Sequence, residues 1–267
     1  MPSTAAIVRV LMLLSILILL LPMVQAKAIK LRTSDGVQLS ADAHVAANST
    51  RGVLLVHQSG KSSKDWQMLT SVLNRAGFST AAIDLRGHGK SDKAGSPLVE
   101  ADYLNMAKDL EAGLKWLRKQ GVKDVACVGA SLGANLCVRA AAEDGEFTGL
   151  VLLSPAIKYN GISSGNAIRQ YGERPVSIVV SSDDRKSSSQ SAILKRLAMG
   201  DVRYEVLNGA GHGTEMLYRS APLAPDIGKW LMQPYLKNAE DRQPVKTVDA
   251  AIPSAEEGKG KKLQVHQ

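Results

Sequence analysis

The sequence predicts an α/β fold in which a mostly parallel, twisted sheet is covered by helices on both faces. Three observations predict it. Strand-like apolar runs alternate with helical patterns, the runs are continuous in Val, Ile and Leu, and an antiparallel hairpin precedes them. Continuous apolar runs are typical of strands buried on both faces, and strands that alternate with helices form parallel sheets through right-handed crossovers.

The first element expected is a β-hairpin. Its two arms, 28–32 and 37–45, alternate in polarity around the turn sequence Ser34-Asp35-Gly36. This alternation is typical of paired strands with one covered face. The N-terminal part of the sheet is therefore expected to be antiparallel.

Six further strands and five helices follow in alternation. The strands are expected at 52–57, 78–85, 124–130, 149–155, 175–182 and 202–208. Apolar residues at helical spacing predict helices at 64–77, 103–121, 131–143, 188–199 and 221–233. The interval between the strands at 149–155 and 175–182 is too short for a separate cap domain, so we expect no cap and a shallow, open site.

Both ends of the chain differ from this pattern. Residues 1–26 combine Arg9, an apolar run and the small residues Val24 and Ala26, which together predict a secretory signal cleaved after Ala26. An uncleaved membrane anchor is the alternative. Residues 237–267 have no aromatic residue and no periodicity, which predicts a disordered tail. One domain at 27–236 remains, and we expect the mature protein to be exported without a stable membrane span.

Charge and cysteine content narrow the function classes. The formal net charge is +8, but Lys and Arg are scattered among acidic residues without an aromatic stripe, so nucleic acid is not the expected partner. No Cys/His/Asp cluster has metal-ligand spacing, and no metal or organic cofactor is expected.

Cys127 lies in an apolar strand and Cys137 in the following helix; we expect two free, buried thiols, with a disulfide as the alternative.

The strongest functional signal is the sequence Gly129-Ala130-Ser131-Leu132-Gly133. It fits G-x-S-x-G at the point where a strand runs into a helix. A sharp turn of this kind exposes the serine hydroxyl above the sheet, and the helix N-terminus beneath it favours developing negative charge. Ser131 is therefore the predicted nucleophile.

A nucleophilic serine needs a base that is held by a third group. Of the five histidines, only His212 follows the last predicted strand within the domain, so it is the predicted base. Asp183 and Asp184 follow the strand at 175–182. Asp184 is the preferred acid because it stands further out on its loop, and Asp183 is the alternative.

The order Ser131, Asp184, His212 resembles the triad order of the α/β-hydrolase family. The loop Asp84-Leu85-Arg86-Gly87-His88-Gly89-Lys90-Ser91 and the segments LLVHQSG (54–60), GASLGA and GAGHG are also similar to that family, over nearly all of residues 27–233. The chain most resembles small, cap-less bacterial hydrolases of the dienelactone-hydrolase and serine-peptidase-like groups.

The resemblance also implies an oxyanion hole. By position, its backbone N–H donors are Ser59, with Gln58 as the alternative, and Leu132. Relatives usually have His-Gly where this chain has His57-Gln58. His57 and the loop at 84–91 are expected to support the structure rather than to transfer protons.

These inferences predict an exported serine hydrolase that cleaves carboxylic esters of small molecules through an acyl-enzyme. A peptidase or an acyltransferase with the same triad is one alternative. A non-catalytic binding protein of this fold is another, and it is motivated by Gln58. The sequence predicts neither the oligomeric state nor the identity of the acyl group.

Overall fold

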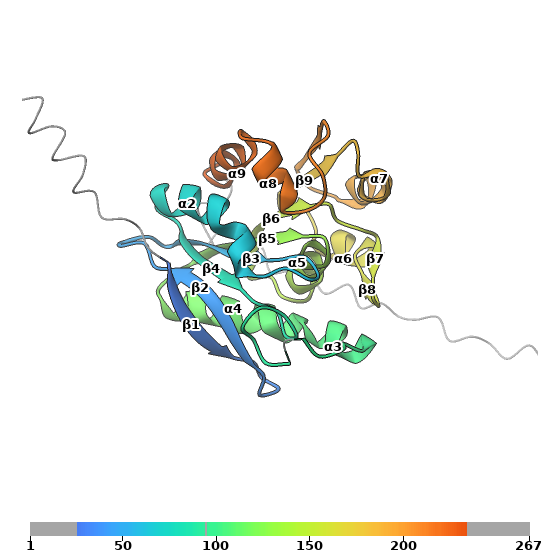
Figure 1. The fold of residues 1–267 in the computed structure, drawn as a ribbon. Helices are drawn as coiled ribbons and strands as arrows, with labels where there is room; N and C mark the ends of the chain where they lie inside the picture. The colour runs from blue at the N-terminus through green and yellow to red at the C-terminus, as the bar shows by residue number, and fades with distance from the viewer. Residues whose placement is uncertain (1–25, 94, 234–267) are drawn as a thin grey trace, which may run out of the picture.

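The computed structural model describes residues 26–93 and 95–233, which form a layered α/β unit (Figure 1). The predicted signal sequence, apart from Ala26, and the predicted tail lie outside the described residues. Within the described ranges, none of the helices has the length and apolar character needed to cross a membrane.

An eight-stranded sheet forms the centre of the molecule, in the order β1-β2-β4-β3-β5-β6-β9-β10. β1 and β2 pair antiparallel, β2 pairs antiparallel with β4, and every other neighbouring pair is parallel. This confirms the predicted fold class. The strands are β1 Lys27–Arg32, β2 Gln38–His44, β3 Arg51–Val56, β4 Ser79–Ile83, β5 Asp124–Ala130, β6 Phe147–Leu153, β9 Val176–Ser181 and β10 Val202–Leu207.

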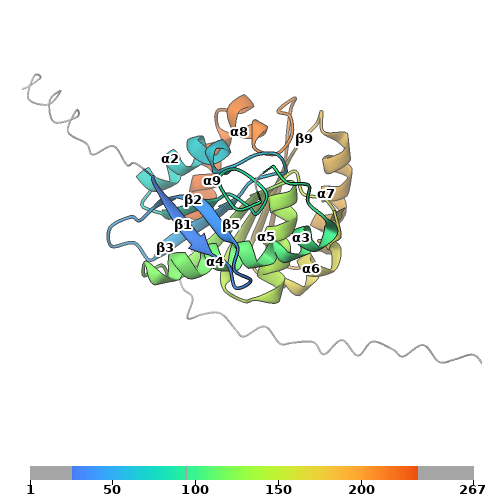
Figure 2. The same cartoon turned by 60° about the horizontal axis from the view of Figure 1, so that its bottom comes forward.

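Helices cover both faces of this sheet (Figures 1 and 2). Buried residues of α4, α5, α6 and α7 belong to one apolar core, and those of α2, α8 and α9 belong to the other. The helices are the 3-10 helix η1 Ser63–Trp66, α2 Gln67–Arg75, α3 Glu100–Asn105, α4 Ala107–Lys119, α5 Leu132–Glu143, α6 Gly165–Gln170, α7 Arg185–Leu197, α8 Glu215–Arg219 and α9 Leu223–Leu231.

Strand β3 shows how one sequence serves both cores. Leu54 and Val56 belong to the first core, whereas Val53 and Leu55 belong to the second, and all four are fully buried. Successive side chains of a strand point to opposite faces, so a continuous apolar run fills both layers. This is the reason why the apolar runs of the sequence do not alternate.

The helices of the structure differ from the prediction in several places. The helix expected at 103–121 is divided into α3 and α4 at Met106, whose side chain is fully buried and whose N–H bonds the Tyr103 carbonyl at 3.2 Å in a tight turn. The helix expected at 221–233 is α9, and the short helices α6 and α8 have no counterpart in the prediction.

The interval after β6 contains no cap domain. It holds the two-stranded hairpin of β7 Lys158–Tyr159 and β8 Ile162–Ser163, followed by α6. These short elements pack against α5 and α7 rather than forming a separate layer. The absence of a cap over this interval agrees with the predicted fold.

The expectation of two free thiols is wrong. Cys127 of β5 and Cys137 of α5 form a disulfide, and their Cα atoms are 5.8 Å apart. Both side chains are fully buried. Helix α5 folds back along β5 immediately after the turn at Ser131, which brings the two cysteines within the usual bridging distance.

Candidate active site

Ser131 stands at a strained turn between β5 and α5. Its backbone has φ 48° and ψ −112°, a conformation that side-chain-bearing residues rarely adopt. The turn is held because the Ser131 N–H donates to the Leu153 carbonyl at 2.8 Å and the Ser131 carbonyl accepts from the Asn135 N–H at 3.1 Å. Ser131 is thus the N-cap of α5, where unpaired helix N–H groups favour negative charge.

The two glycines that flank this turn are required by close backbone packing. A Cβ on Gly129 would lie 2.4 Å from the Gly133 carbonyl oxygen, and a Cβ on Gly133 would lie 2.1 Å from the Val56 carbonyl oxygen. Both distances are far below van der Waals contact. The glycines let α5 start directly against the end of β3.

His212 and Asp184 meet on the neighbouring loops. His212 Nδ1 lies 2.6 Å from Asp184 Oδ2, and the side chains of His212 and Asp184 are 41% and 15% exposed. Ser187 Oγ is a second, longer contact of Nδ1 at 3.5 Å. The carboxylate therefore orients the imidazole ring through its Nδ1 edge, while the rest of the ring remains accessible to a substrate.

Asp184 is held by the start of α7 as well. It is the N-cap of α7, and its Oδ1 accepts from the Ser187 N–H at 3.2 Å. Burial raises the pKa of Asp184, but the hydrogen bonds from His212 and Ser187 outweigh burial and leave the pKa below its ordinary value. Asp184 is therefore ionised at neutral pH, as a partner for an imidazolium must be.

Asp183, the alternative acid, bonds the end of β9 and the backbone before His212 rather than the His212 ring. Its Oδ1 accepts hydrogen bonds from Ser181 Oγ and, at 3.1 Å, from the Gly211 N–H. The Ser181 hydroxyl and the Gly211 N–H hold the pKa of Asp183 below its ordinary value. Asp184, and not Asp183, is the carboxylate in contact with the His212 ring.

The His212 loop is attached to the strand next to the nucleophile. The Gly213 N–H donates to Ser154 Oγ at 3.0 Å, and Ser154 follows Leu153, whose carbonyl binds the Ser131 N–H. Among the described residues, no hydrogen bond joins the Ser131 hydroxyl to His212. Catalytic hydrogen bonds are often long in unliganded enzymes and tighten when a substrate binds.

The predicted oxyanion donors lie on adjacent segments. Val56 pairs with Gly129, so the loop that begins at His57 and the start of α5 leave the same edge of the sheet. Leu132 is the first residue of α5, and Ser59 lies in the loop after β3. A Cβ on Gly133 would also lie 2.7 Å from the His57 carbonyl oxygen, which shows how closely the two segments approach.

His57 supports this loop. Its Nε2 accepts from the Leu85 N–H at 3.0 Å, so Nδ1 carries the proton and donates to the Gln58 carbonyl at 2.7 Å. Complete burial lowers the pKa of His57 to about 4. A neutral ring with both nitrogens engaged in structural hydrogen bonds agrees with the supporting role expected for His57.

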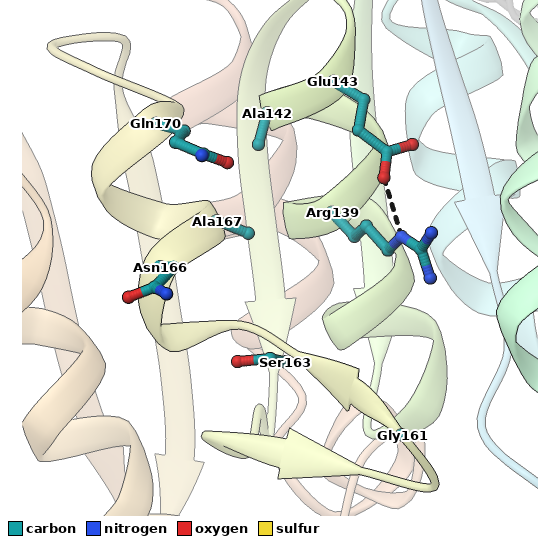
Figure 3. Close-up of a pocket in the computed structure, with 8 residues that line it drawn as sticks. All are labelled: Arg139, Ala142, Glu143, Gly161, Ser163, Asn166, Ala167 and Gln170. Carbon is teal, nitrogen blue, oxygen red and sulfur yellow. Dashed lines mark hydrogen bonds and ion pairs between the residues drawn. The ribbon is translucent and has the colours of Figure 1, made fainter. Parts of the chain in front are cut away.

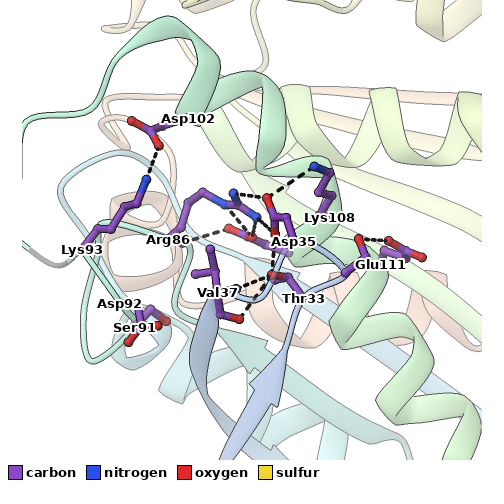
Figure 4. Close-up of polar contacts among 12 residues, drawn as sticks. Thr33, Asp35, Val37, Arg86, Ser91, Asp92, Lys93, Asp102, Lys108 and Glu111 are labelled. Atoms are coloured by element: carbon purple, nitrogen blue, oxygen red, sulfur yellow. Dashed lines mark hydrogen bonds and ion pairs between the residues drawn. The ribbon is translucent and has the colours of Figure 1, made fainter.

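The loop after β4 is held by a network of buried polar contacts (Figure 4). Arg86 is 2% exposed and forms ion pairs with Asp109 at 2.7 Å and with Asp35 at 2.8 Å. Asp84 accepts from the Ser63 N–H at 2.7 Å and from the Lys90 N–H at 2.8 Å. The network ties this loop to the hairpin β1–β2, to α4 and to η1, and it has a structural role.

A separate pocket of about 240 Å³ lies between α5, the β7–β8 hairpin and α6 (Figure 3). It is bordered by the Arg139–Glu143 ion pair, and none of the predicted triad residues lines it. In the described part of the chain, no group of three or more His, Cys, Asp or Glu side chains could hold a metal ion.

The sequence did not reveal two polar side chains that hold the His212 loop. Gln58 Oε1 accepts from the Thr214 N–H at 2.8 Å, and Ser154 Oγ accepts from the Gly213 N–H. Gln58 was visible as a departure from the usual His-Gly pair, but this departure did not predict which group its side chain contacts. Ser154 gave no signal, since its positive φ of 50° depends on the fold.

Part of the chain is similar to a known protein family. Residues 47–177 match the family described as serine aminopeptidase, S33. No curated protein sequence matches the chain at a significant level.

Solved structures resemble the chain over most of its length. An esterase of Pyrococcus furiosus superposes with a TM-score of 0.67 at 21% identity, covering 78% of this chain and 91% of its own. Dienelactone hydrolase from Anabaena variabilis superposes with a TM-score of 0.63 at 21% identity, covering 78% of this chain and 97% of its own. Est1E from Butyrivibrio proteoclasticus, solved with ferulic acid, superposes with a TM-score of 0.62 at 17% identity, covering 75% of this chain and 97% of its own. With its sheet order, its strained serine turn and these likenesses, the chain has the α/β-hydrolase fold.

Proposed function

We propose that the protein is a serine hydrolase that cleaves carboxylic-ester-type bonds of small molecules. The observation that carries this proposal is the 2.6 Å contact of His212 with Asp184, on a loop anchored beside the strained turn of Ser131. The esterases among the similar structures support the ester as the substrate class.

The proposed reaction has two steps. His212 Nε2 takes the proton of the Ser131 hydroxyl while Oγ attacks the ester carbonyl carbon, and the N–H groups of Ser59 and Leu132 stabilise the oxyanion. Asp184 stabilises the imidazolium without taking its proton. The imidazolium protonates the leaving alcohol as the C–O bond breaks, and an acyl-enzyme remains.

Water completes the cycle. His212 removes a proton from a water molecule, which attacks the acyl carbon, and the carboxylic acid leaves as Ser131 regains its proton. Each atom of the reaction comes from the ester, the water or these side chains, so the proposal needs no cofactor.

The test is hydrolysis of p-nitrophenyl esters graded by acyl length, together with labelling by a fluorophosphonate probe. The wild type is expected to turn over at least one ester and to be labelled, and Ser131→Ala is expected to lose both. An unlabelled wild type whose ester turnover equals that of Ser131→Ala would refute the proposal.

A peptidase with the same triad is the second candidate, because the matching family is described as serine aminopeptidase. Aminoacyl p-nitroanilides offer the corresponding amide bond. Faster release of nitroaniline than of nitrophenol from substrates with the same acyl group would favour the peptidase.

We further propose that the protein is exported after cleavage behind Ala26. The first strand begins at Lys27, directly after the proposed cleavage point, and the Cys127–Cys137 disulfide suits an oxidising compartment. Sequencing the N-terminus of protein secreted by a bacterial host tests this. A chain that starts at Met1 in the membrane fraction would refute it.

A further inference from the structure

Gln58 connects the two loops that the proposed reaction depends on. Its side chain is buried, and it directly precedes Ser59. Its backbone carbonyl accepts from His57 Nδ1 at 2.7 Å and from the Lys61 N–H at 3.2 Å. The backbone of Gln58 therefore belongs to the proposed oxyanion loop.

The side chain of Gln58 holds the opposite loop. Oε1 accepts from the Thr214 N–H at 2.8 Å and from the Thr214 hydroxyl at 3.3 Å, across 156 positions of sequence. Gly213 has φ +59°, and a Cβ on it would lie 1.9 Å from Oε1. Only glycine at this position lets the amide of Gln58 reach the chain immediately after His212.

Ser154 holds the same loop from the other side. Its hydroxyl accepts from the Gly213 N–H at 3.0 Å, and its side chain is buried. The two residues after His212 are thus each fixed by one side-chain oxygen. One of these oxygens belongs to the proposed oxyanion loop, and the other to the end of strand β6.

We propose that Gln58 is a positioning residue that sets the place of His212 relative to Ser131 and the oxyanion donors. The inference rests on the proposed function. The His212 ring is partly exposed and bonded chiefly to Asp184, so its position depends on how firmly the loop backbone is held. A displacement of about 1 Å in such a site costs on the order of a hundredfold in rate.

The test compares two substitutions of Gln58 with a matched control. Gln58→Met keeps the length but removes the acceptor, and Gln58→Glu keeps an oxygen acceptor. The control is Gln190→Met, because Gln190 Oε1 likewise accepts from a backbone N–H, that of Ile157 at 3.0 Å. Ester hydrolysis, its pH profile and amide hydrogen exchange are measured for each variant.

Gln58→Met is expected to lower kcat roughly ten- to a hundredfold with KM nearly unchanged, and to speed amide exchange at residues 213–214. Gln58→Glu is expected to keep most of kcat. The acid limb of its pH–rate profile should move to higher pH, because a negative charge in contact with Thr214, two residues after the base, favours the protonated base. Gln190→Met is expected to leave kcat and the exchange at 213–214 unchanged.

Two results would overturn the inference. One is a Gln58→Met variant with wild-type kcat and unchanged exchange at 213–214. The other is an equal loss of kcat in Gln58→Met and Gln58→Glu without faster exchange. A wild type that hydrolyses no ester would instead refute the proposed function, and the exchange measurement would still decide whether Gln58 holds the loop.

Discussion

His57 makes the stability of the fold depend on pH in a window that its burial defines. The ring is fully buried, and burial is the largest influence that lowers its pKa from 6.5 to about 4. The nearby His88 lowers the pKa further, whereas the Gln58 carbonyl, Asp84 and Asp65 raise it. In the unfolded chain the same imidazole is protonated below about pH 6.5.

The size of the effect follows from linkage. Each pKa unit corresponds to about 1.4 kcal/mol, so lowering the pKa of His57 from 6.5 to about 4 is worth about 3 kcal/mol. Because the folded-state pKa is the lower one, the contribution is complete above pH 6.5. It is lost as pH falls, since the unfolded chain then binds a proton that the folded protein does not, and the loss ends near pH 4.

The assay is urea unfolding of the wild type and of His57→Asn between pH 7.5 and 4. Asn keeps a donor for the Gln58 carbonyl but does not titrate. At pH 7 the wild type is expected to be the more stable protein, because His57→Asn leaves the buried Leu85 N–H without its acceptor. Toward pH 4 the difference between the two free energies of unfolding should shrink by about 3 kcal/mol.

Other titrating groups, including His44 and Asp184, are present in both proteins and cancel in the difference. Parallel stability curves for wild type and His57→Asn across this range would refute the assignment of His57 as a buried neutral ring. A difference that grows toward low pH would reverse the sign of the reasoning.

Three further predictions concern the site and its support. Asp184→Asn should lower kcat roughly a thousandfold or more, and Asp183→Asn less than about tenfold, because only Asp184 contacts His212; equal losses in ester hydrolysis would contradict this. Gly133→Ala should lower the free energy of unfolding by about 3 kcal/mol, because its Cβ would lie 2.1 Å from a carbonyl oxygen. Gly165→Ala is the control: its Cβ meets nothing nearer than 3.8 Å, so it should change the free energy of unfolding by less than about 1 kcal/mol. Thiol titration of the denatured, unreduced protein should find no free thiol, and reduction should cost about 3 kcal/mol; two free thiols would contradict the disulfide.

The sequence predicted best what local composition determines. The strand expected at 124–130 is β5 at Asp124–Ala130, because polar residues and a glycine-rich turn bound a continuous apolar run. The nucleophile turn was readable for the same reason, since the glycines on both sides of Ser131 are needed for local packing. The helix at 188–199 was expected three residues too late, because α7 begins at Arg185. Its N-cap is Asp184, whose side chain both caps the helix and contacts His212.

What tertiary contacts determine could not be read from the chain. The hairpin of β7 and β8 has only two residues in each strand, too few for a periodic pattern. The disulfide depends on how α5 lies along β5, which a spacing of ten residues does not specify. The contact of Gln58 with Thr214 joins segments 156 residues apart, so the sequence marked the residue but not its partner.

The short interval after β6, which holds no cap among the described residues, has a consequence for the second step of the proposed reaction. A cap excludes water and protects an acyl-enzyme for transfer to another acceptor. In this protein the interval after β6 holds a small hairpin and one short helix, and the side chain of His212 is 41% exposed. Water therefore reaches the base without a conformational change, which favours hydrolysis of the acyl-enzyme over transfer. The precision that a cap would supply must then come from the fixed loops themselves, and the oxygens of Gln58, Ser154 and Asp183 hold the loop of the base at three successive points around His212.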